Sequence, residues 1–311
     1  MATMPAQQAG VCPAPSASQG SAPGATLDMD YYLNEGLEGV ERQKYRGTRE
    51  FTYAIESKLT ELGLGDWKGG QYLVFTSVTQ GEFTELDRYR DRYHKSLRFM
   101  YLEEKEVLIV KISLGLIKGV VCGELGRTLT DKADEMGLYR GGVVGSGAAT
   151  FQGLGSKNEA GATFIPILSE NPSRRWPTVV FGGGISESLE RMRVDSRWWL
   201  ESSLGWVKIV ILISISKSER KIHIEQWEMP AVLNRRVTQA HPHPVREVTK
   251  IHEVDIIGGV ATGAPLRLDF EKIYRRPPGP GEGDTVYTAQ GLEEWAAIIW
   301  SDDVEDLLDF M

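Results

Sequence analysis

The sequence predicts an α/β fold built around one strand–helix–strand unit. Residues 178–181 are β-branched and aromatic and lie between a proline and three glycines, which is typical of a buried strand. Residues 186–203 place apolar side chains at helical spacing directly after that strand. Residues 207–215 are almost continuously aliphatic, as expected of a central strand covered on both faces. Strands joined so closely by a helix should be parallel and right-handed. The glycine turn predicted at 182–184 lies where α/β sheets usually place their chemistry.

Length and composition are those of an ordinary globular protein, with 311 residues of which 41% are apolar and 25% charged. A net charge of −8 argues against a strong non-specific nucleic-acid binder, although a local basic patch would be compatible with it. The two cysteines, Cys12 and Cys122, are distant and are predicted to be free thiols. The chain has no apolar run of the roughly 18 residues that a membrane span needs and no signal peptide. We therefore expect an intracellular protein, cytoplasmic or nuclear, that is not bound to a membrane.

The N-terminal part begins with a predicted disordered tail. Residues 1–26 carry no charged side chain and are rich in Ala, Pro, Ser, Gly and Gln, so they cannot bury enough apolar surface to fold. Residues 27–311 are predicted to form a single domain. Its first elements are a helix from Phe51 to Gly63, a strand at 72–78, a solvated and partly helical charged stretch at 82–95, and a β-hairpin made by 97–102 and 107–112. The Arg and Tyr residues of the charged stretch could form a nucleic-acid face, but a solvated surface is favoured.

The remaining elements divide into a core at about 97–229 and a C-terminal extension at 230–311. The core adds a helix at 119–138 and strands at 148–151, 162–165 and 221–227, with a loop at 152–161. The extension is predicted to contain a surface loop at 230–247, strands near 248–257 and 266–274, and a helix from Gln290.

From 119 to 216 the predicted order is helix, three strands, helix and strand. That α-β-β-β-α-β order is the common core of the PD-(D/E)XK phosphodiesterases, the restriction-endonuclease-like superfamily. The segments GLGSKNEAGATFIP (153–166), WPTVVFGGGISESLERMRVDSRWW (176–199), IHIEQWE (222–228) and TAQGLEEWA (288–296) resemble a fungal branch of that superfamily. The resemblance covers roughly 97–300 and is most specific at 176–199. It implies a mixed central sheet, followed by C-terminal strands and a helix.

The resemblance also implies a chemistry, metal-assisted hydrolysis of a phosphodiester in DNA or RNA. In this superfamily an Asp that opens the second strand and a Glu in the third hold Mg²⁺, which activates water and neutralises developing charge. In the fungal branch these two acids fall where Gly161 and Gly182 stand here. Glycine has no side chain, so both metal-binding carboxylates are absent. We therefore expect a catalytically impaired nuclease-like protein, a pseudoenzyme without a cofactor, that serves as a binding or interaction module. Nucleic acid is the partner that the resemblance suggests, and a homodimer would fit the many relatives that pair.

One alternative stays open, an active Mg²⁺-dependent nuclease with displaced acids. Glu159 lies two residues before Gly161, Glu187 lies near the start of the 186–203 helix, and Glu124 lies on the helix before the three strands. Lys208 opens the strand after the 186–203 helix and could supply positive charge to a transition state. Each of the four also has a structural explanation. Glu187 would interact favourably with the helix dipole, Glu124 would face solvent, and Lys208 would extend its ammonium group from a strand end.

A second alternative is a protein-interaction module unrelated to nucleic acid, which would use the tail and the 230–247 loop. The glycine triplet before Ser186 could hold a phosphate on exposed amides, but a tight turn is favoured because no complete phosphate-binding motif is present. His241 and His243 lack a third metal ligand nearby and indicate a surface loop. Arg191 and Asp195 are four residues apart and predict an exposed ion pair on the helix.

Overall fold

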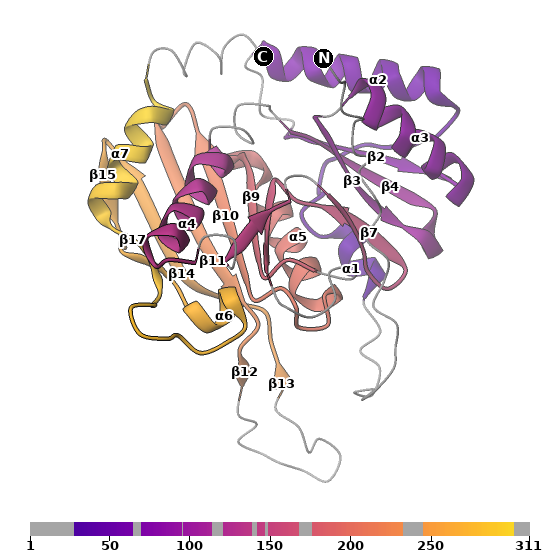
Figure 1. The fold of residues 1–311 in the computed structure, drawn as a ribbon. Helices are drawn as coiled ribbons and strands as arrows, with labels where there is room; N and C mark the ends of the chain where they lie inside the picture. The colour runs from indigo at the N-terminus through magenta and orange to yellow at the C-terminus, as the bar shows by residue number, and fades with distance from the viewer. Residues whose placement is uncertain are drawn as a thin grey trace, which may run out of the picture.

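The computed structural model describes residues 28–64, 70–94, 96–113, 121–138, 142–146, 149–167, 176–232 and 245–301. The predicted tail and most of the 230–247 loop, including His241 and His243, lie outside these ranges. The described residues form seven helices and two large mixed sheets (Figure 1), so the predicted α/β class is confirmed. In the part of the chain that is described, no helix combines the length and the apolar character needed to span a bilayer.

The first sheet has six strands in the order β1-β2-β4-β3-β7-β6. Their bounds are Arg42–Lys44 (β1), Tyr72–Thr76 (β2), Leu97–Leu102 (β3), Val107–Ile112 (β4), Thr150–Gln152 (β6) and Ser156–Glu159 (β7). The β3–β4 hairpin has the predicted bounds and turns through a short 3₁₀ segment at Glu103–Lys105. It belongs to this first sheet, however, whereas the resemblance implied one central sheet.

The second sheet has seven strands in the order β15-β14-β11-β10-β9-β8-β5. Their bounds are Val143–Gly145 (β5), Ala162–Pro166 (β8), Val179–Ile185 (β9), Ile209–Ser216 (β10), Lys221–Glu228 (β11), Thr249–Ile257 (β14) and Val260–Thr262 (β15). Strands β9 and β10 are parallel and are connected by helix α5, Leu189–Ser202, as predicted. Every other pair in this sheet is antiparallel. Two small pairs complete the strands, β12 (Ala231–Val232) with β13 (Val245–Arg246) and β16 (Leu266–Leu268) with β17 (Thr285–Tyr287).

The predicted glycine turn is wrong, because Gly182–Gly184 continue strand β9. These glycines pair with Leu212, Ile213 and Ser214 of β10, and that cross-strand pairing outweighs the low strand propensity of glycine. The exposed amides of a turn are therefore not available to hold a phosphate there.

Three further segments differ from prediction in their type of structure or in the sheet to which they belong. The strand predicted at 148–151 is β6, which lies in the first sheet, and the strand that precedes β8 in the second sheet is β5. The predicted loop at 152–161 contains β7, whose polar sequence gives a weak strand signal. The strand predicted at 266–274 is β16 followed by a short helix, α6, at Phe270–Tyr274, which Asp269 caps.

Helix α5 lies between the two sheets (Figure 1). One buried cluster joins its Trp198 to Val74 of β2, Ile109 of β4 and Leu212 of β10. Because α5 contacts both sheets, eight of its side chains are buried, far more than one apolar stripe would give. Helix α1, Met29–Asn34, packs against α5 as well.

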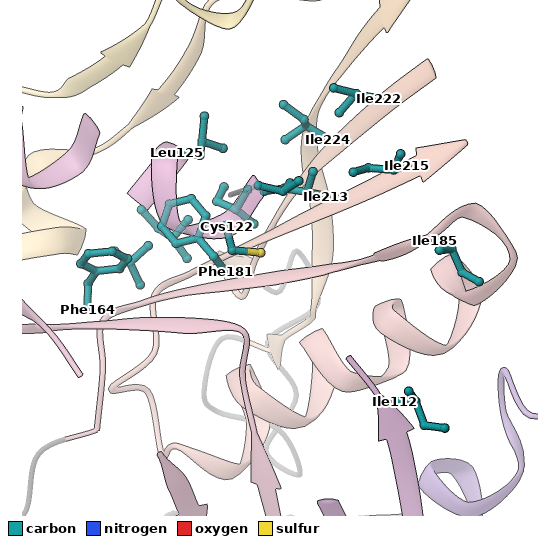
Figure 2. Close-up of a cluster of buried hydrophobic side chains, with 14 of the residues drawn as sticks. Ile112, Cys122, Leu125, Phe164, Phe181, Ile185, Ile213, Ile215, Ile222 and Ile224 are labelled. Atoms are coloured by element: carbon teal, nitrogen blue, oxygen red, sulfur yellow. The ribbon is translucent and has the colours of Figure 1, made fainter. Parts of the chain in front are cut away.

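The outer faces of the sheets are covered by other helices. Helices α2 (Thr48–Gly63) and α3 (Gln80–Tyr93) share a cluster with Phe99 of the first sheet. The charged stretch predicted as solvated is thus a full helix that Thr79 and Glu82 cap, and it buries Phe83 and Leu86. Helix α4, Gly123–Glu135, covers the second sheet, where Leu125 and the preceding Cys122 belong to the same buried cluster as Phe164 and Phe181 (Figure 2). Helix α7, Ala289–Ile299, packs beside β14 and β15.

Candidate functional site

Gly161 and Gly182 lie beside each other where β8 and β9 pair. Ala162 pairs with Phe181 at the end of that antiparallel register, and Gly161 and Gly182 are the next residues of the two segments. Both line a cavity of about 40 Å³ between the two sheets, together with residues of β3, β4, β7, β10 and α5. The two glycines that the resemblance singles out therefore border the same small hollow. A space of this size holds one or a few water-sized groups.

The surroundings of the two glycines differ. A Cβ atom at position 161 would lie 3.0 Å from the carbonyl oxygen of Phe181 and 3.4 Å from Sγ of Cys122, on the side of the sheet that α4 covers. A Cβ atom at position 182 would meet only Leu212 Cδ2, at 3.2 Å, in the cluster that contains α5. A side chain at 182 thus needs a small shift of one methyl group, whereas a side chain at 161 presses on the backbone.

A lysine ammonium reaches the cavity from the first sheet. Lys111 of β4 donates a hydrogen bond from Nζ to the carbonyl oxygen of Gly183, at 2.8 Å. The same Nζ lies 3.3 Å from the place that a Cβ atom at Gly184 would take. Burial lowers the pKa of Lys111, and the nearby carboxyl of Asp195 opposes this effect.

Asp195 of α5 also lines the cavity. It accepts a hydrogen bond from the Tyr72 hydroxyl at 3.2 Å and pairs with Nε of Arg191 at 3.4 Å. Burial raises the pKa of Asp195, although the charges of Arg191 and Lys111 oppose this rise.

The prediction that Arg191 and Asp195 form an exposed ion pair is wrong. Arg191 is 1% exposed because α5 lies between two sheets, and it donates hydrogen bonds to the carbonyl oxygens of Tyr32 and Glu35.

Glu159, one of the proposed displaced acids, ends β7 at the cavity wall. Its side chain is 4% exposed and binds the guanidinium of Arg90. One carboxylate oxygen, Oε1, also accepts a hydrogen bond from Thr150 Oγ1 at 2.7 Å, while Oε2 is buried without a hydrogen-bond partner among the described residues. Arg90 further binds Asp87 and Asp91, so Glu159 belongs to a largely buried ion network.

Two of the other three predicted residues, Glu124 and Lys208, are not among the described residues that line the cavity. Glu124 pairs with Arg127 at 3.0 Å on the half-exposed first turn of α4, which agrees with its structural explanation. Lys208 directly precedes β10, and its backbone N–H donates to the carbonyl oxygen of Thr178 at 2.9 Å. Glu187 lies in the 3₁₀ turn Ser186–Ser188 before α5, and its side chain is outside the described atoms.

A second cluster of charged groups lies on β11 and β14, formed by His223, Glu225 and Glu253. Their ligand atoms lie within 4.8 Å of one another, the one such grouping of His, Cys, Asp and Glu among the described residues. Glu225 is fully buried and accepts hydrogen bonds from His223 Nε2 (3.1 Å), Trp227 Nε1 (2.9 Å) and Arg193. Burial alone would raise the pKa of Glu225, but these hydrogen bonds outweigh it and hold that pKa well below its usual range.

Neither set of residues fits a divalent metal ion. At the cavity, Gly161 and Gly182 offer no carboxylate, Lys111 brings a positive charge, and Glu159 and Asp195 are already paired with arginines. At the second cluster, Arg193 and Lys250 bind Glu225, and Lys250 also binds Glu253, so two cations already neutralise these acids. Mg²⁺ needs several free anionic or neutral oxygen ligands. We therefore derive no metal-dependent step from this arrangement.

Sequence reasoning missed Lys111 and Asp195 as cavity residues. Lys111 is the single charged residue in the apolar strand Val107–Ile112, which is a usable signal, but its contact with Gly183 joins residues 72 positions apart. Comparisons with known proteins add no family to this geometry, since no protein family model, curated protein or solved structure matches the chain.

Proposed function

We propose that this chain is a non-catalytic relative of the PD-(D/E)XK nucleases that acts as a binding or interaction module. The element order supports this relationship. Within the second sheet, α4, β5, β8, β9, α5 and β10 follow one another as helix, three strands, helix and strand, with β6 and β7 inserted between β5 and β8. This order matches the α-β-β-β-α-β order on which the resemblance rests. Its first strand, however, is β5 and not the strand predicted at 148–151.

The observation that carries the proposal is that Gly161 and Gly182 line the same cavity. Two acids are missing at adjacent positions, and the ammonium of Lys111 lies beside the same strand. A cation placed there disfavours a divalent metal ion by charge repulsion, which is weakly screened in a buried site. Metal-dependent hydrolysis thus has neither its ligands nor a suitable electrostatic environment.

Metal binding tests this directly. Titrating Mn²⁺ into the full chain and recording its electron paramagnetic resonance signal should show no bound ion at micromolar to low millimolar concentration. Gly182→Glu, whose Cβ atom would meet only a Leu212 methyl group, should raise binding modestly. Glu225→Gln serves as the control for ions held by the second cluster. Tight Mn²⁺ binding by the unchanged chain that Glu225→Gln leaves intact would overturn the proposal.

Nucleic acid is the partner class that the proposal favours, and an intracellular location, cytoplasmic or nuclear, goes with it. Fluorescence anisotropy with labelled single- and double-stranded DNA and RNA, without divalent ions, should show binding that weakens with salt, because phosphate contacts release counterions. Mass photometry at the same concentrations tests the homodimer. Absence of binding to all four nucleic acids would leave a protein-interaction module instead.

A second candidate, the active nuclease with displaced acids, is favoured by one observation. Glu159 and Asp195 both line the cavity, although each is paired with an arginine. If purified protein cleaves DNA with Mg²⁺, Glu159→Gln and Asp195→Asn should each abolish cleavage. Cleavage that survives both substitutions would exclude this candidate.

A further inference from the structure

Two surface helices on the outer side of the first sheet, α2 and α3, carry arginines without acidic partners. The helices contact each other where α2 begins and α3 ends, because Thr52 Oγ1 and the Tyr89 hydroxyl are 3.0 Å apart (Figure 1). Four exposed arginines lie within six residues of these two contact positions. None of them forms an ion pair or a hydrogen bond with another described residue: Arg46, Arg49, Arg88 and Arg92.

Arginines elsewhere on the surface are arranged differently. Arg127, Arg267 and Arg276 each bind a carboxylate, which neutralises most of the charge that they could offer to a partner. Arg88 and Arg92 instead lie one turn apart on α3, and like charges at this spacing destabilise a helix slightly. An anion bound across the two guanidinium groups would remove that repulsion.

Aromatic rings lie on the same two helices. Tyr53 of α2 and Tyr93 of α3 are 74% and 62% exposed, and within the described ranges they are the only exposed tyrosine, phenylalanine or tryptophan side chains. The ring centre of Tyr93 lies 5.1 Å from that of Tyr89 and 5.9 Å from the guanidinium of Arg92. Exposed rings beside unpaired guanidinium groups suit a ligand that has both flat bases and phosphates, since bases stack on aromatic rings and arginine binds phosphate oxygens.

We propose that the surface formed by the start of α2 and the end of α3 binds single-stranded nucleic acid. The partner class rests on the proposed function, whereas the surface lies outside the cavity between the sheets and is a separate assignment. A single strand is favoured over a duplex because its bases are free to stack on a tyrosine. Exposed acids at Glu50, Glu56 and Glu85 lie on the same helices, so binding depends on the arginines near Tyr89 rather than on the total charge of the helices.

Fluorescence anisotropy on the full chain without divalent ions tests the choice of partner. The probes are a labelled single-stranded DNA, the RNA of the same sequence and the corresponding DNA duplex. Both single strands should bind more tightly than the duplex. The logarithm of the binding constant should fall with the logarithm of the salt concentration, with a slope of about −3 if four arginines each contact a phosphate. Equal or tighter binding of the duplex would overturn the proposal.

Matched variants test the surface itself. Arg88→Gln/Arg92→Gln should weaken binding and make the salt slope shallower by about 1.4. Arg127→Gln/Arg267→Gln removes the same charge from arginines that have acidic partners, and it should leave the slope nearly unchanged. Tyr53→Ala should weaken binding about fivefold or more, whereas Tyr53→Phe keeps the ring and should bind as the unchanged chain does. Circular dichroism checks that each variant is folded, and equal weakening by the two double variants would overturn the proposal.

The outcomes distinguish this proposal from the proposed function. Binding that survives both Arg88→Gln/Arg92→Gln and Tyr53→Ala would overturn the surface and leave the function standing. Metal-dependent cleavage by a chain whose binding is lost in these variants would overturn the function and support the surface. Failure of both single strands to bind would overturn the surface, and binding of phosphatidylserine vesicles in their place would assign it to a membrane instead.

Discussion

The side chains around Gly184 leave little space for a larger residue at this position. A Cβ atom at Gly184 would lie 2.7 Å from Met192 Sδ, 3.0 Å from Gln71 Oε1 and 3.3 Å from Lys111 Nζ. Gln71 itself bridges the two sheets, since it accepts from the backbone N–H of Ile185 and donates to the carbonyl oxygen of Ile112. The glycine at 184 therefore permits close contact between the sheets.

Alanine substitutions separate this packing role from strand propensity. Gly184→Ala should lower the free energy of unfolding by about 1–3 kcal/mol, the usual cost of overpacking a core. Gly182→Ala is the matched control in the same strand, and it should be near neutral because only one Leu212 methyl group must move. Urea denaturation of both variants measures the difference. Equal stability of the two would contradict the inter-sheet packing described here.

The ion network of His223 and Glu225 predicts a pH-dependent stability. A hydrogen bond to Glu225 raises the pKa of His223 above 6.5, although burial opposes it, and Asp255 adds to the rise. A raised pKa means that the charged imidazole stabilises the fold. This contribution is fully present below pH 6.5 and is lost as pH rises through the folded-state pKa.

His223→Gln should therefore destabilise the protein most at mildly acidic pH. The difference in unfolding free energy from the unchanged chain should shrink as pH rises above the unperturbed value of 6.5. Chemical denaturation in matched buffers across that window measures it. A difference that grows toward alkaline pH would show that the sign assigned to the His223 charge is wrong.

Among the elements, α5 organises the molecule because it packs on both sheets. Its Arg191 binds the carbonyl oxygens at the end of α1, and its Trp198 donates to Ser156 Oγ of β7 at 2.8 Å. The chain after α1 comes so close to α5 that Gly36, at φ +68°, would place a Cβ atom 2.7 Å from the Cα atom of Arg191. Only glycine meets both conditions at once.

Gly36→Ala should therefore destabilise the protein more than Gly39→Ala. Gly39 also has a positive φ, +79°, but nothing lies within 4 Å of its Cβ position, so it measures the backbone cost alone. We expect about 1 kcal/mol from backbone strain in the control and about 1–3 kcal/mol more from the clash at Gly36. Thermal unfolding followed by circular dichroism compares them, and a smaller loss at Gly36 would contradict the contact with α5.

Local sequence signals predicted which residues form strands and helices far better than they predicted which strands pair with each other. The β3–β4 hairpin and the β9–α5–β10 unit follow from alternation, a polar turn and helical spacing, all of which act within a few residues. Nothing local shows that the hairpin joins β2 and β7 rather than the second sheet. The extension of β9 through three glycines likewise depends on β10, which lies about 30 residues further along the chain.

Only part of the candidate site could be predicted, because the rest of it also depends on contacts between residues far apart in the sequence. The family resemblance pointed to Gly161 and Gly182, and the two do line one cavity. The charged groups that share it, Lys111 and Asp195, come from β4 and α5 and are brought there only by the packing of two sheets. Glu124 and Lys208 are near the glycines in the predicted order of elements but are not among the residues that line the cavity.

At the scale of the whole molecule, two sheets enclose α5 and a small cavity to which Gly161 and Gly182 bring no side chain and Lys111 brings an ammonium group. We propose that this arrangement is not catalytic. The most direct measurement is Mg²⁺- and Mn²⁺-dependent cleavage of fluorescent single- and double-stranded DNA, with an active metal-dependent nuclease as the positive control. The Gly161→Asp/Gly182→Glu variant is assayed beside the unchanged chain, and cleavage by that variant alone would support the family relationship. We predict no cleavage by the unchanged chain with either metal. Metal-dependent cleavage by the unchanged chain, removed by a chelator, would contradict the claim.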